Sequence, residues 1–459
     1  MLDLDPGTMM IISFFVLLAL RVPVAFALGC SALLAMWQIG FGLDLVGDLL
    51  SAGIAKFSLL AIPFFILAGT LMGVVGIAER MIGFFRVLIG SLPGGMGVVG
   101  TVVCLFWGAV SGSGPASVAA IGPLIIKGMA EDGYPRPFAA ALVCTGAALS
   151  IVIPPSIGLV IYGVIAETSI AQLFLSAIVP GLIMGVLMLA TLPFAKRTKP
   201  LTASVSRASI PEGAPVPPDA KAVTGLQAIS PAPYEGLSYP QRLARSFRDA
   251  FWGLMTPVVI LGGIYTGVFT PTEAAIVATV YALAVGALVY RTLTIRNLYT
   301  VLTESAASSA VVMLVVAYAS LFGWVVTVDD LVGKYSEVLL GLSGNEWVIL
   351  AIIMIVVLIA GMFMDAITIM FIALPIFLPV VRTLGWDPVW FGVLLMINLA
   401  IGLFTPPVGI NLFVAANITR LSLEKIAIGA LPFLLTALIG LAIIAGFPEL
   451  SHLLGTVGR

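Results

Sequence analysis

Two short stretches of the sequence carry oxygen-bearing side chains inside long apolar segments. In the first, Ser111, Ser113 and Ser117 alternate with small residues in the run SGSGPAS. Glycine allows close approach of two backbones, and serine hydroxyls beside unwound carbonyls and helix ends can coordinate a small cation. Small residues also favour close helix packing in membranes, so the run alone fits either role.

The second stretch, GMFMDA at residues 361–366, contains a single carboxylate, Asp365. An ionisable residue at membrane depth is costly, and it is by default a candidate functional group. Asp365 could bind a cation, relay a proton or cap a helix, since Asp favours helix N-termini. These three roles are not exclusive.

The sequence Thr405-Pro406-Pro407-Val408-Gly409 cannot continue an α-helix, although apolar residues flank it on both sides. Each proline lacks an N–H and clashes with the preceding turn. Broken helices in the membrane are the usual place for ion and substrate sites of secondary transporters. A proline kink without any ligand is the alternative, because membrane helices tolerate such kinks.

A second copy of this pattern favours the functional interpretation. Pro154-Pro155 lies in similar apolar surroundings, 252 residues before Pro406-Pro407. The same offset also pairs Pro123 with Pro375 and Pro180 with Pro432, so four of the six prolines in residues 123–180 have a counterpart. Paired interruptions in corresponding halves indicate a transporter binding site.

Asn398 and Asn411 flank the second break and are, with Ser117, the candidates for hydrogen bonding a substrate. Interhelical hydrogen bonding is an equally good explanation for the two asparagines. Glu273 follows Thr270-Pro271-Thr272, and this pattern favours a helix cap over a ligand.

The composition predicts a membrane protein and excludes several other classes. The chain is 61% hydrophobic and 9% charged, with a mean hydropathy of +1.18, whereas about a quarter of a soluble domain is charged. The net charge of −1 and the lack of a basic patch argue against nucleic-acid binding. One histidine, three scattered cysteines and no phosphate-binding loop leave no basis for an enzyme or an ATPase.

Runs of about 20 apolar residues, the length needed to span a bilayer, organise the chain into two halves. Residues 1–195 form the first half and residues 251–459 the second, with a polar, proline-rich linker at 196–250. We expect five spans and one re-entrant hairpin in each half. The hairpins fall at 96–128 and 347–382, and the broken helices at 137–165 and 389–417.

The distribution of positive charge predicts the orientation. An odd number of spans per half gives the two halves opposite orientations. If the linker is cytoplasmic, 17 of the 21 Lys and Arg residues fall on that side. The positive-inside rule favours this arrangement, which places both termini outside the cytoplasm.

Four segments together resemble a known family: GAVSGSGPASVAAIG, IPPSIGLVIYG, GMFMDAITIM and NLAIGLFTPPVGINLF. They are similar to the large membrane (M) subunit of tripartite ATP-independent periplasmic (TRAP) transporters, and the resemblance covers nearly the whole chain. The resemblance implies an all-α inverted-repeat fold of the elevator type in the bacterial inner membrane. It also implies Na⁺-driven uptake of an organic acid without ATP.

Two kinds of partner and two Na⁺ sites follow from the resemblance. A soluble periplasmic binding protein (P) delivers the substrate, and a small four-helix membrane subunit (Q) completes the complex. One Na⁺ site would use Ser111 and Ser113 with the first break, and the other Gly361, with Asp365 nearby, and the second break. The break residues of the second site are Gly402, Thr405 and Val408, and the 252-residue offset nominates Ser150, Ile153 and Ser156 for the first.

Other functions remain open on the residues alone. A one-component carboxylate symporter could share this architecture, and an operon without a binding-protein gene would favour it. A channel or a membrane scaffold has no need of paired breaks and hairpins. The substrate itself is not encoded here if a separate protein selects it.

Overall fold

The computed structural model describes residues 5–42, 44–90, 92, 94–195 and 236–454, and this part of the chain contains helices and no strands. The helices of the first half are α1 (Pro6–Ala19), α2 (Val24–Ile39), α3 (Asp44–Ile54), α4 (Ala61–Val74), α5 (Ile77–Ile89), α6 (Gly95–Ser111), α7 (Gly114–Glu131), α8 (Arg136–Ala148), α9 (Ile157–Ala166) and α10 (Ile170–Leu189). Those of the second are α11 (Tyr239–Tyr265), α12 (Pro271–Ala284), α13 (Ile295–Val328), α14 (Leu331–Leu342), α15 (Glu346–Phe363), α16 (Ala366–Thr383), α17 (Pro388–Leu403), α18 (Ile410–Thr419), α19 (Leu423–Gly446) and α20 (Glu449–His452).

Eight helical segments in the described part of the chain are long and apolar enough to cross a membrane. They are Phe57–Val74, Ile170–Phe194, Tyr239–Tyr265, Pro271–Val289, Ile295–Val328, Glu346–Phe363, Ala366–Thr383 and Leu423–Gly446. The protein is therefore an all-α integral membrane protein. Both arms of the second predicted hairpin, α15 and α16, have 18 residues each, so their length alone does not distinguish a hairpin from two spans.

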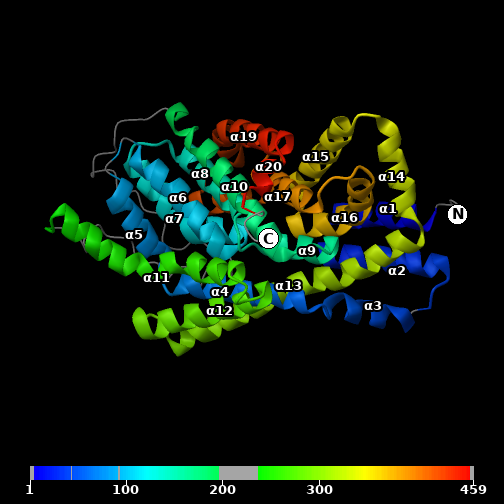
Figure 1. Ribbon diagram of the computed structural model, residues 1–459, viewed down its shortest axis with the longest axis horizontal. Helices are drawn as coiled ribbons and strands as arrows, with labels where there is room; N and C mark the ends of the chain where they lie inside the picture. The colour runs from blue at the N-terminus through cyan, green and yellow to red at the C-terminus, as the bar shows by residue number, and fades with distance from the viewer. Residues whose placement is uncertain (1–4, 43, 91, 93, 196–235, 455–459) are drawn as a thin grey trace.

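The helix boundaries repeat with the proline offset. Helix α16 begins and ends 252 residues after α7. A 3₁₀ turn, η2 (Leu149–Ile151), extends α8 to give the helical segment Arg136–Ile151. Helix α17 begins and ends 252 residues after this segment. Figure 1 shows α6 with α7, and α15 with α16, as two helical pairs on either side of the region where α9, α10 and α17 lie.

One helix of the first half, α3, is not among the predicted segments. Helix α3 lies alongside α13, where Gly53 allows close contact with Ser320. A 3₁₀ turn, η1 (Phe57–Leu60), then leads into α4. At the position that corresponds to α3, η1 and α4, the second half has one continuous helix, α13, of 34 residues. Residues 44–54 contain two Asp residues among apolar ones, so they do not form an apolar run of spanning length.

The first helix of the second half begins earlier than predicted. The composition predicts a linker over residues 196–250, but α11 starts at Tyr239. Ser238 is the N-cap of this helix, and its N–H donates to Oε1 of Gln241. Arg242, Arg245 and Arg248 therefore lie on a helix. Residues 196–235 are outside the described residues. The cap predicted for Glu273 is confirmed, because its Oε2 accepts the N–H of Thr270 at 2.8 Å.

The buried core is built around the first parts of the two broken helices. Every residue of α8 from Phe138 to Ala148 is buried, and so is every residue of α17 from Val389 to Leu403. A helix that is apolar on all sides belongs inside a protein or a membrane. The first break is likewise buried or half-buried throughout, whereas in the second break Pro407 is exposed.

Helix α5 carries Glu79, Arg80 and Arg86 among apolar residues, and its first turn is fixed to the rest of the protein. Arg80 donates to the carbonyl oxygens of Val75 (3.1 Å) and Gly76 (2.7 Å), and its guanidinium carbon lies 3.8 Å from the ring centroid of Tyr290. Beside it, Oε2 of Glu79 is buried without a hydrogen-bond partner. Burial raises the pKa of the Glu79 carboxyl, an effect partly offset by the neighbouring Arg80.

We expect Glu79→Gln to stabilise the protein more at pH 8 than at pH 4.5. The unfolded carboxyl loses its proton near pH 4.5, whereas the folded one, with its raised pKa, retains it to higher pH. Stability is therefore lost as pH rises through this interval, and the loss is complete above the folded pKa. The apparent melting temperature of detergent-solubilised protein, measured against pH, checks this. Glu131→Gln, at an exposed carboxylate, is the control; equal gains in both variants would contradict the explanation.

Candidate functional site

Both helix breaks occur where the sequence predicts them. The first lies between η2 and α9, and the second between α17 and α18. The peptide bonds Pro154-Pro155 and Pro406-Pro407 are both cis. Gly409 has φ of +56°, which favours glycine, and it directly precedes α18.

The tip of the first hairpin, residues 111–114 between α6 and α7, packs against the first break. A Cβ atom added to Gly108 would lie 2.8 Å from Cα of Ser150, and one added to Gly112 would lie 3.4 Å from the backbone nitrogen of Ile157. The first distance is too short for any side chain, whereas the second is at the edge of ordinary van der Waals contact. Glycine is therefore needed at Gly108, where the hairpin and the break meet backbone to backbone.

The predicted serines of this region have different partners. The hydroxyls of Ser111 and Ser117 donate to the carbonyl oxygen of Ser113, at 3.3 and 2.7 Å. Ser156 caps α9, accepting the N–H of Leu159 at 3.5 Å, and donates to the carbonyl of Ile151. Donation leaves the lone pairs of the Ser111 and Ser117 hydroxyl oxygens able to accept, so both could still bind a cation.

The second hairpin meets the second break in a matching way. A Cβ on Gly402 would lie 2.7 Å from both Cα and C of Gly361, and the N–H of Gly409 donates to the carbonyl of Met362 at 3.0 Å. Asp365 is the N-cap of α16. Its two carboxylate oxygens accept the N–H and the hydroxyl of Thr368, at 3.0 and 2.6 Å. The capping role considered for Asp365 is thus present.

Each broken helix also reaches into the opposite half of the chain. Helix α18 lies against α7 and α8, while α9 lies against α16 and α17. Asn411 Nδ2 donates to the carbonyl of Cys144 at 2.9 Å, and the Asn411 side chain also lies close to Gly114 at the first hairpin tip. Asn398 Nδ2 donates to the carbonyl of Met354 in α15 at 2.7 Å. The interhelical hydrogen bonds considered for both asparagines are present.

Three buried oxygens in this region have no hydrogen-bond partner: Ser150 Oγ, Asn398 Oδ1 and Asn411 Oδ1. All three side chains are fully buried. A buried acceptor without a partner costs about 1–3 kcal/mol, so each such oxygen needs an explanation. Neutral oxygens suit a small, hard monovalent cation, and the described residues contain no group of three His, Cys, Asp or Glu that could hold a transition metal.

The remaining predicted site residues lie on the breaks themselves. Thr405 is buried and its hydroxyl donates to the carbonyl of Ile401. Ile153 and Val408 are partly buried, and their side chains are apolar, so only their backbone carbonyls could serve as ligands. Of the predicted residues, Ser150 lies at the first hairpin–break contact and Gly361 and Gly402 meet at the second. The roles of all the predicted residues as Na⁺ or substrate ligands stay predictions.

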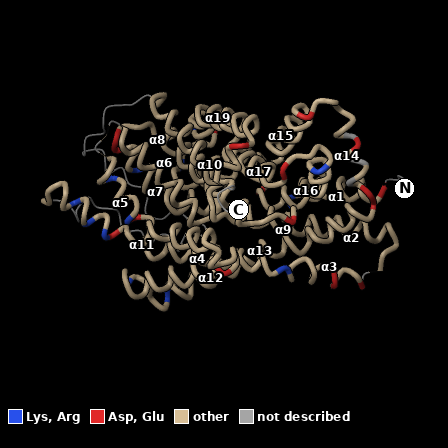
Figure 2. The backbone as a smooth tube through the Cα atoms, in the orientation of Figure 1, with Lys and Arg blue, Asp and Glu red and all other residues tan. Residues whose placement is uncertain are grey.

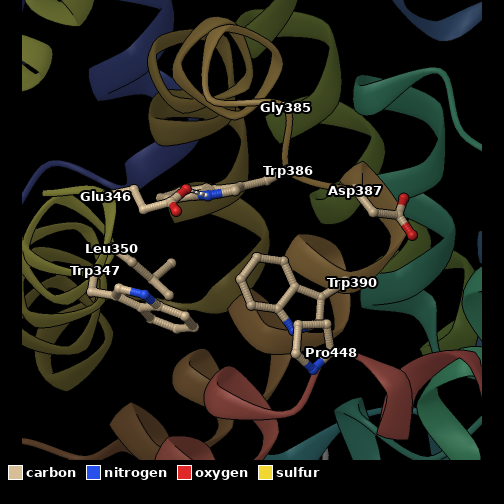
Figure 3. Close-up of a pocket in the computed structure, with 8 residues that line it drawn as sticks. All are labelled: Glu346, Trp347, Leu350, Gly385, Trp386, Asp387, Trp390 and Pro448. Carbon is tan, nitrogen blue, oxygen red and sulfur yellow. Dashed lines mark hydrogen bonds between the residues drawn. The ribbon is translucent and has the colours of Figure 1, made fainter.

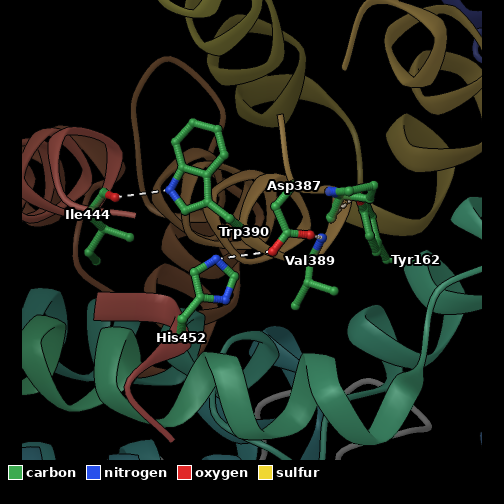
Figure 4. Close-up of polar contacts among 7 residues, drawn as sticks. Tyr162, Asp387, Val389, Trp390, Ile444 and His452 are labelled. Carbon is green, nitrogen blue, oxygen red and sulfur yellow. Dashed lines mark hydrogen bonds and ion pairs between the residues drawn. The ribbon is translucent and has the colours of Figure 1, made fainter. Parts of the chain in front are cut away.

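A polar group at one end of α17 was not predicted. Asp387 caps α17 by accepting the N–H of Val389 at 2.9 Å, and its other carboxylate oxygen lies 3.0 Å from Nε2 of His452 (Figure 4). Tyr162 donates to the carbonyl of Pro388 at 2.6 Å. These contacts join three segments far apart in sequence. The only local signal was the run Trp386-Asp387-Pro388, which has the Asp-Pro pattern of a helix start.

Comparison with known proteins identifies the family. Residues 11–450 match the family described as tripartite ATP-independent periplasmic transporter, DctM component. The C4-dicarboxylate TRAP transporter large permease protein DctM of Pseudomonas aeruginosa is 38% identical over 86% of this chain and 85% of its own. The sialic acid TRAP transporter large permease protein SiaM of Vibrio cholerae is 34% identical over 95% and 96%.

A third relative is longer than this chain. The isethionate TRAP transporter permease protein DctMQ of Oleidesulfovibrio alaskensis is 37% identical over 97% of this chain, which spans 66% of that relative. Among solved structures, the YdaH transporter of Alcanivorax borkumensis matches with a TM-score of 0.60 over 97% of this chain and 98% of its own, at 14% identity. That match supports the fold alone. On the family match and these identities, the chain belongs to the DctM family of TRAP transporter large permeases, which are multi-pass inner-membrane transport proteins and not enzymes.

Proposed function

We propose that this chain carries an organic acid across the inner membrane by Na⁺ symport, receiving the acid from a soluble periplasmic binding protein. The observation that carries the proposal is the pairing of each hairpin tip with a helix break, with unpartnered oxygens of Ser150, Asn398 and Asn411 in the same region. The relatives named for C4-dicarboxylates and sialic acid support an organic acid as the substrate.

Two Na⁺ sites fit this geometry. The first would use the Ser111 and Ser113 region of the hairpin with Ser150, Ile153 and Ser156, and the second Gly361 with Gly402, Thr405 and Val408. Asp365 would act near the second site through its field, because its carboxylate oxygens already cap α16. Ser117, Asn398 and Asn411 are the proposed substrate contacts.

Movement of the hairpins and broken helices as one body, an elevator mechanism, is part of the proposal. Its support is the close backbone contact between α4 and the first hairpin at Gly69. A Cβ on Gly69 of α4 would lie 3.1 Å from the carbonyl oxygen of Val110 and 3.3 Å from Cα of Ser111. A backbone-to-backbone contact at a glycine, with no side chain of Gly69 in between, suits sliding between two bodies.

Uptake by purified protein in proteoliposomes tests the proposal. We expect accumulation of the acid only when this chain, the small membrane subunit and the cognate binding protein are present together with an inward Na⁺ gradient. The family's tripartite description supports the need for all three. Robust uptake by this chain alone would favour the one-component symporter. An uptake rate that does not change with the Na⁺ gradient would contradict Na⁺ symport.

The charge distribution predicts that residues 196–250 are cytoplasmic and both termini periplasmic. Figure 2 shows Lys and Arg gathered along α5 and α11, while the region around α14 and the N-terminus carries Asp and Glu. Reporter fusions after Lys199 and after Arg459, two positions outside the described residues, check this. We expect opposite sides of the membrane for the two reporters, and the same side for both would contradict the inverted repeat.

A further inference from the structure

A cavity of about 270 Å³ lies away from both helix breaks, where the base of the second hairpin meets the C-terminal segment. Three tryptophans, Trp347, Trp386 and Trp390, surround the gap (Figure 3). Glu346, Leu350, Gly385, Asp387 and Pro448 complete the lining. The transport site described above does not include any of these residues.

The indole N–H groups of Trp386 and Trp390 are already bound, so what these two rings can still offer a ligand is aromatic surface. Nε1 of Trp386 donates to Oε2 of Glu346 at 3.1 Å, and Nε1 of Trp390 donates to the carbonyl of Ile444 at 3.2 Å. Trp386 and Trp390 meet edge to face, with centroids 6.0 Å apart. Ring faces of tryptophan attract cations more than those of any other side chain.

The charge of the cavity is negative. Its lining contains two acids and no Lys or Arg. Asp387 turns its carboxylate away from the tryptophans, towards His452, so Glu346 is the acid that faces the gap (Figures 3 and 4). An organic acid would be repelled here, whereas a guanidinium or ammonium group would find ring faces and a carboxylate together.

We propose that this cavity binds an Arg or Lys side chain of the soluble periplasmic binding protein when that protein docks. The proposal rests on the proposed function and orientation, which put this face in the periplasm. The volume is below the 300–1,000 Å³ usual for a free small ligand, but it suits one side chain. Trp347 is 52% exposed, so the cavity is open to a partner arriving from solution.

The binding affinity of the reconstituted complex for the binding protein tests the proposal. The complex is held in nanodiscs, and the equilibrium Kd is measured for wild type, Glu346→Gln and Trp347→Ala. Gln keeps an acceptor for Trp386 Nε1 but removes the charge. We expect Kd to rise about tenfold in each variant, because each loses part of the cation site, and the effect of Glu346→Gln to shrink at high salt.

Glu449→Gln is the matched control, since Glu449 is an exposed acid next to Pro448 that does not line the cavity. We expect its Kd to stay within twofold of wild type. Unchanged affinity in both cavity variants, or an equal loss in Glu449→Gln, would overturn the proposal. So would quenching of tryptophan fluorescence by millimolar free arginine amide without any competition against the binding protein, which would indicate a small-cation site.

Failure here is distinguishable from failure of the proposed function. If the wild-type complex takes up the acid with Na⁺ and the binding protein, but the cavity variants bind that protein with an unchanged Kd, only the cavity assignment is overturned. Wild-type complex that binds the soluble protein through this cavity, yet shows no Na⁺-dependent uptake, would overturn only the transport proposal.

Discussion

Gly402→Ala is expected to lower the uptake rate at least tenfold. A Cβ atom at this position would lie 2.7 Å from Cα and C of Gly361 and 2.9 Å from its carbonyl oxygen. These are backbone atoms, so no side-chain rotation can relieve the contact. Overpacking of this kind typically costs about 1–3 kcal/mol, and separation of α15 from α17 would also pull the hairpin away from the break.

The matched control for this change is Gly323→Ala. Gly323 lies within α13, and an added Cβ would meet no atom within 4 Å. We expect near-normal uptake from it. The purified Gly402→Ala variant should remain monodisperse. Its loss of activity should appear in the initial rate of uptake, normalised to the amount of protein in the membrane. Equal activity of both variants would show that the hairpin and break need not touch during transport.

Much of the fold could be predicted because prolines and apolar length act locally. A proline pair ends a helix wherever it stands, so both breaks could be predicted from Pro154-Pro155 and Pro406-Pro407 alone. The 252-residue offset predicted the order of the elements, and the bounds of α7 and α16 follow it. Helix α3 was not predicted, because with Asp44 and Asp48 it does not look like a spanning segment.

The candidate site could be predicted only in part, because its contacts join distant parts of the chain. The hydrogen bond between Asn411 and Cys144 spans 267 residues. It depends on α18 packing into the opposite half, which the periodicity of either segment does not reveal. The tryptophan cavity likewise combines residues from α15, the start of α17 and Pro448, three segments that meet only in the fold.

Thr405→Ala is expected to weaken the apparent Na⁺ affinity of uptake roughly 10- to 100-fold. The Thr405 hydroxyl hydrogen is used by the carbonyl of Ile401, which fixes the oxygen and leaves its lone pairs able to accept. Removing one contact to a charged group costs about 1.5–3 kcal/mol, and each 1.4 kcal/mol is a factor of ten. The break itself should persist, since Pro406, Pro407 and the Gly409–Met362 hydrogen bond are untouched.

The first proposed site allows a sharper distinction through Ser150→Ala. Ser150 Oγ is buried without a partner, so a purely structural role predicts that its removal is neutral or stabilising, because an unsatisfied polar group disappears. A ligand role predicts instead a lower apparent Na⁺ affinity of uptake at similar stability. Ser111→Ala should also lower the apparent Na⁺ affinity of uptake. The Na⁺ affinity of uptake therefore separates the two explanations of Ser150.

Uptake measured against Na⁺ concentration for Thr405→Ala, Ser150→Ala and Ser111→Ala decides between these explanations. The matched control is Thr101→Ala. Thr101 is fully buried in α6, ten residues before the hairpin tip, and its hydroxyl makes the same kind of bond, to the carbonyl of Gly97. We expect the control to keep its Na⁺ dependence and all variants to approach wild-type rates at saturating Na⁺. If the three site variants transport with unchanged Na⁺ dependence, the breaks are structural kinks, and the cations bind elsewhere.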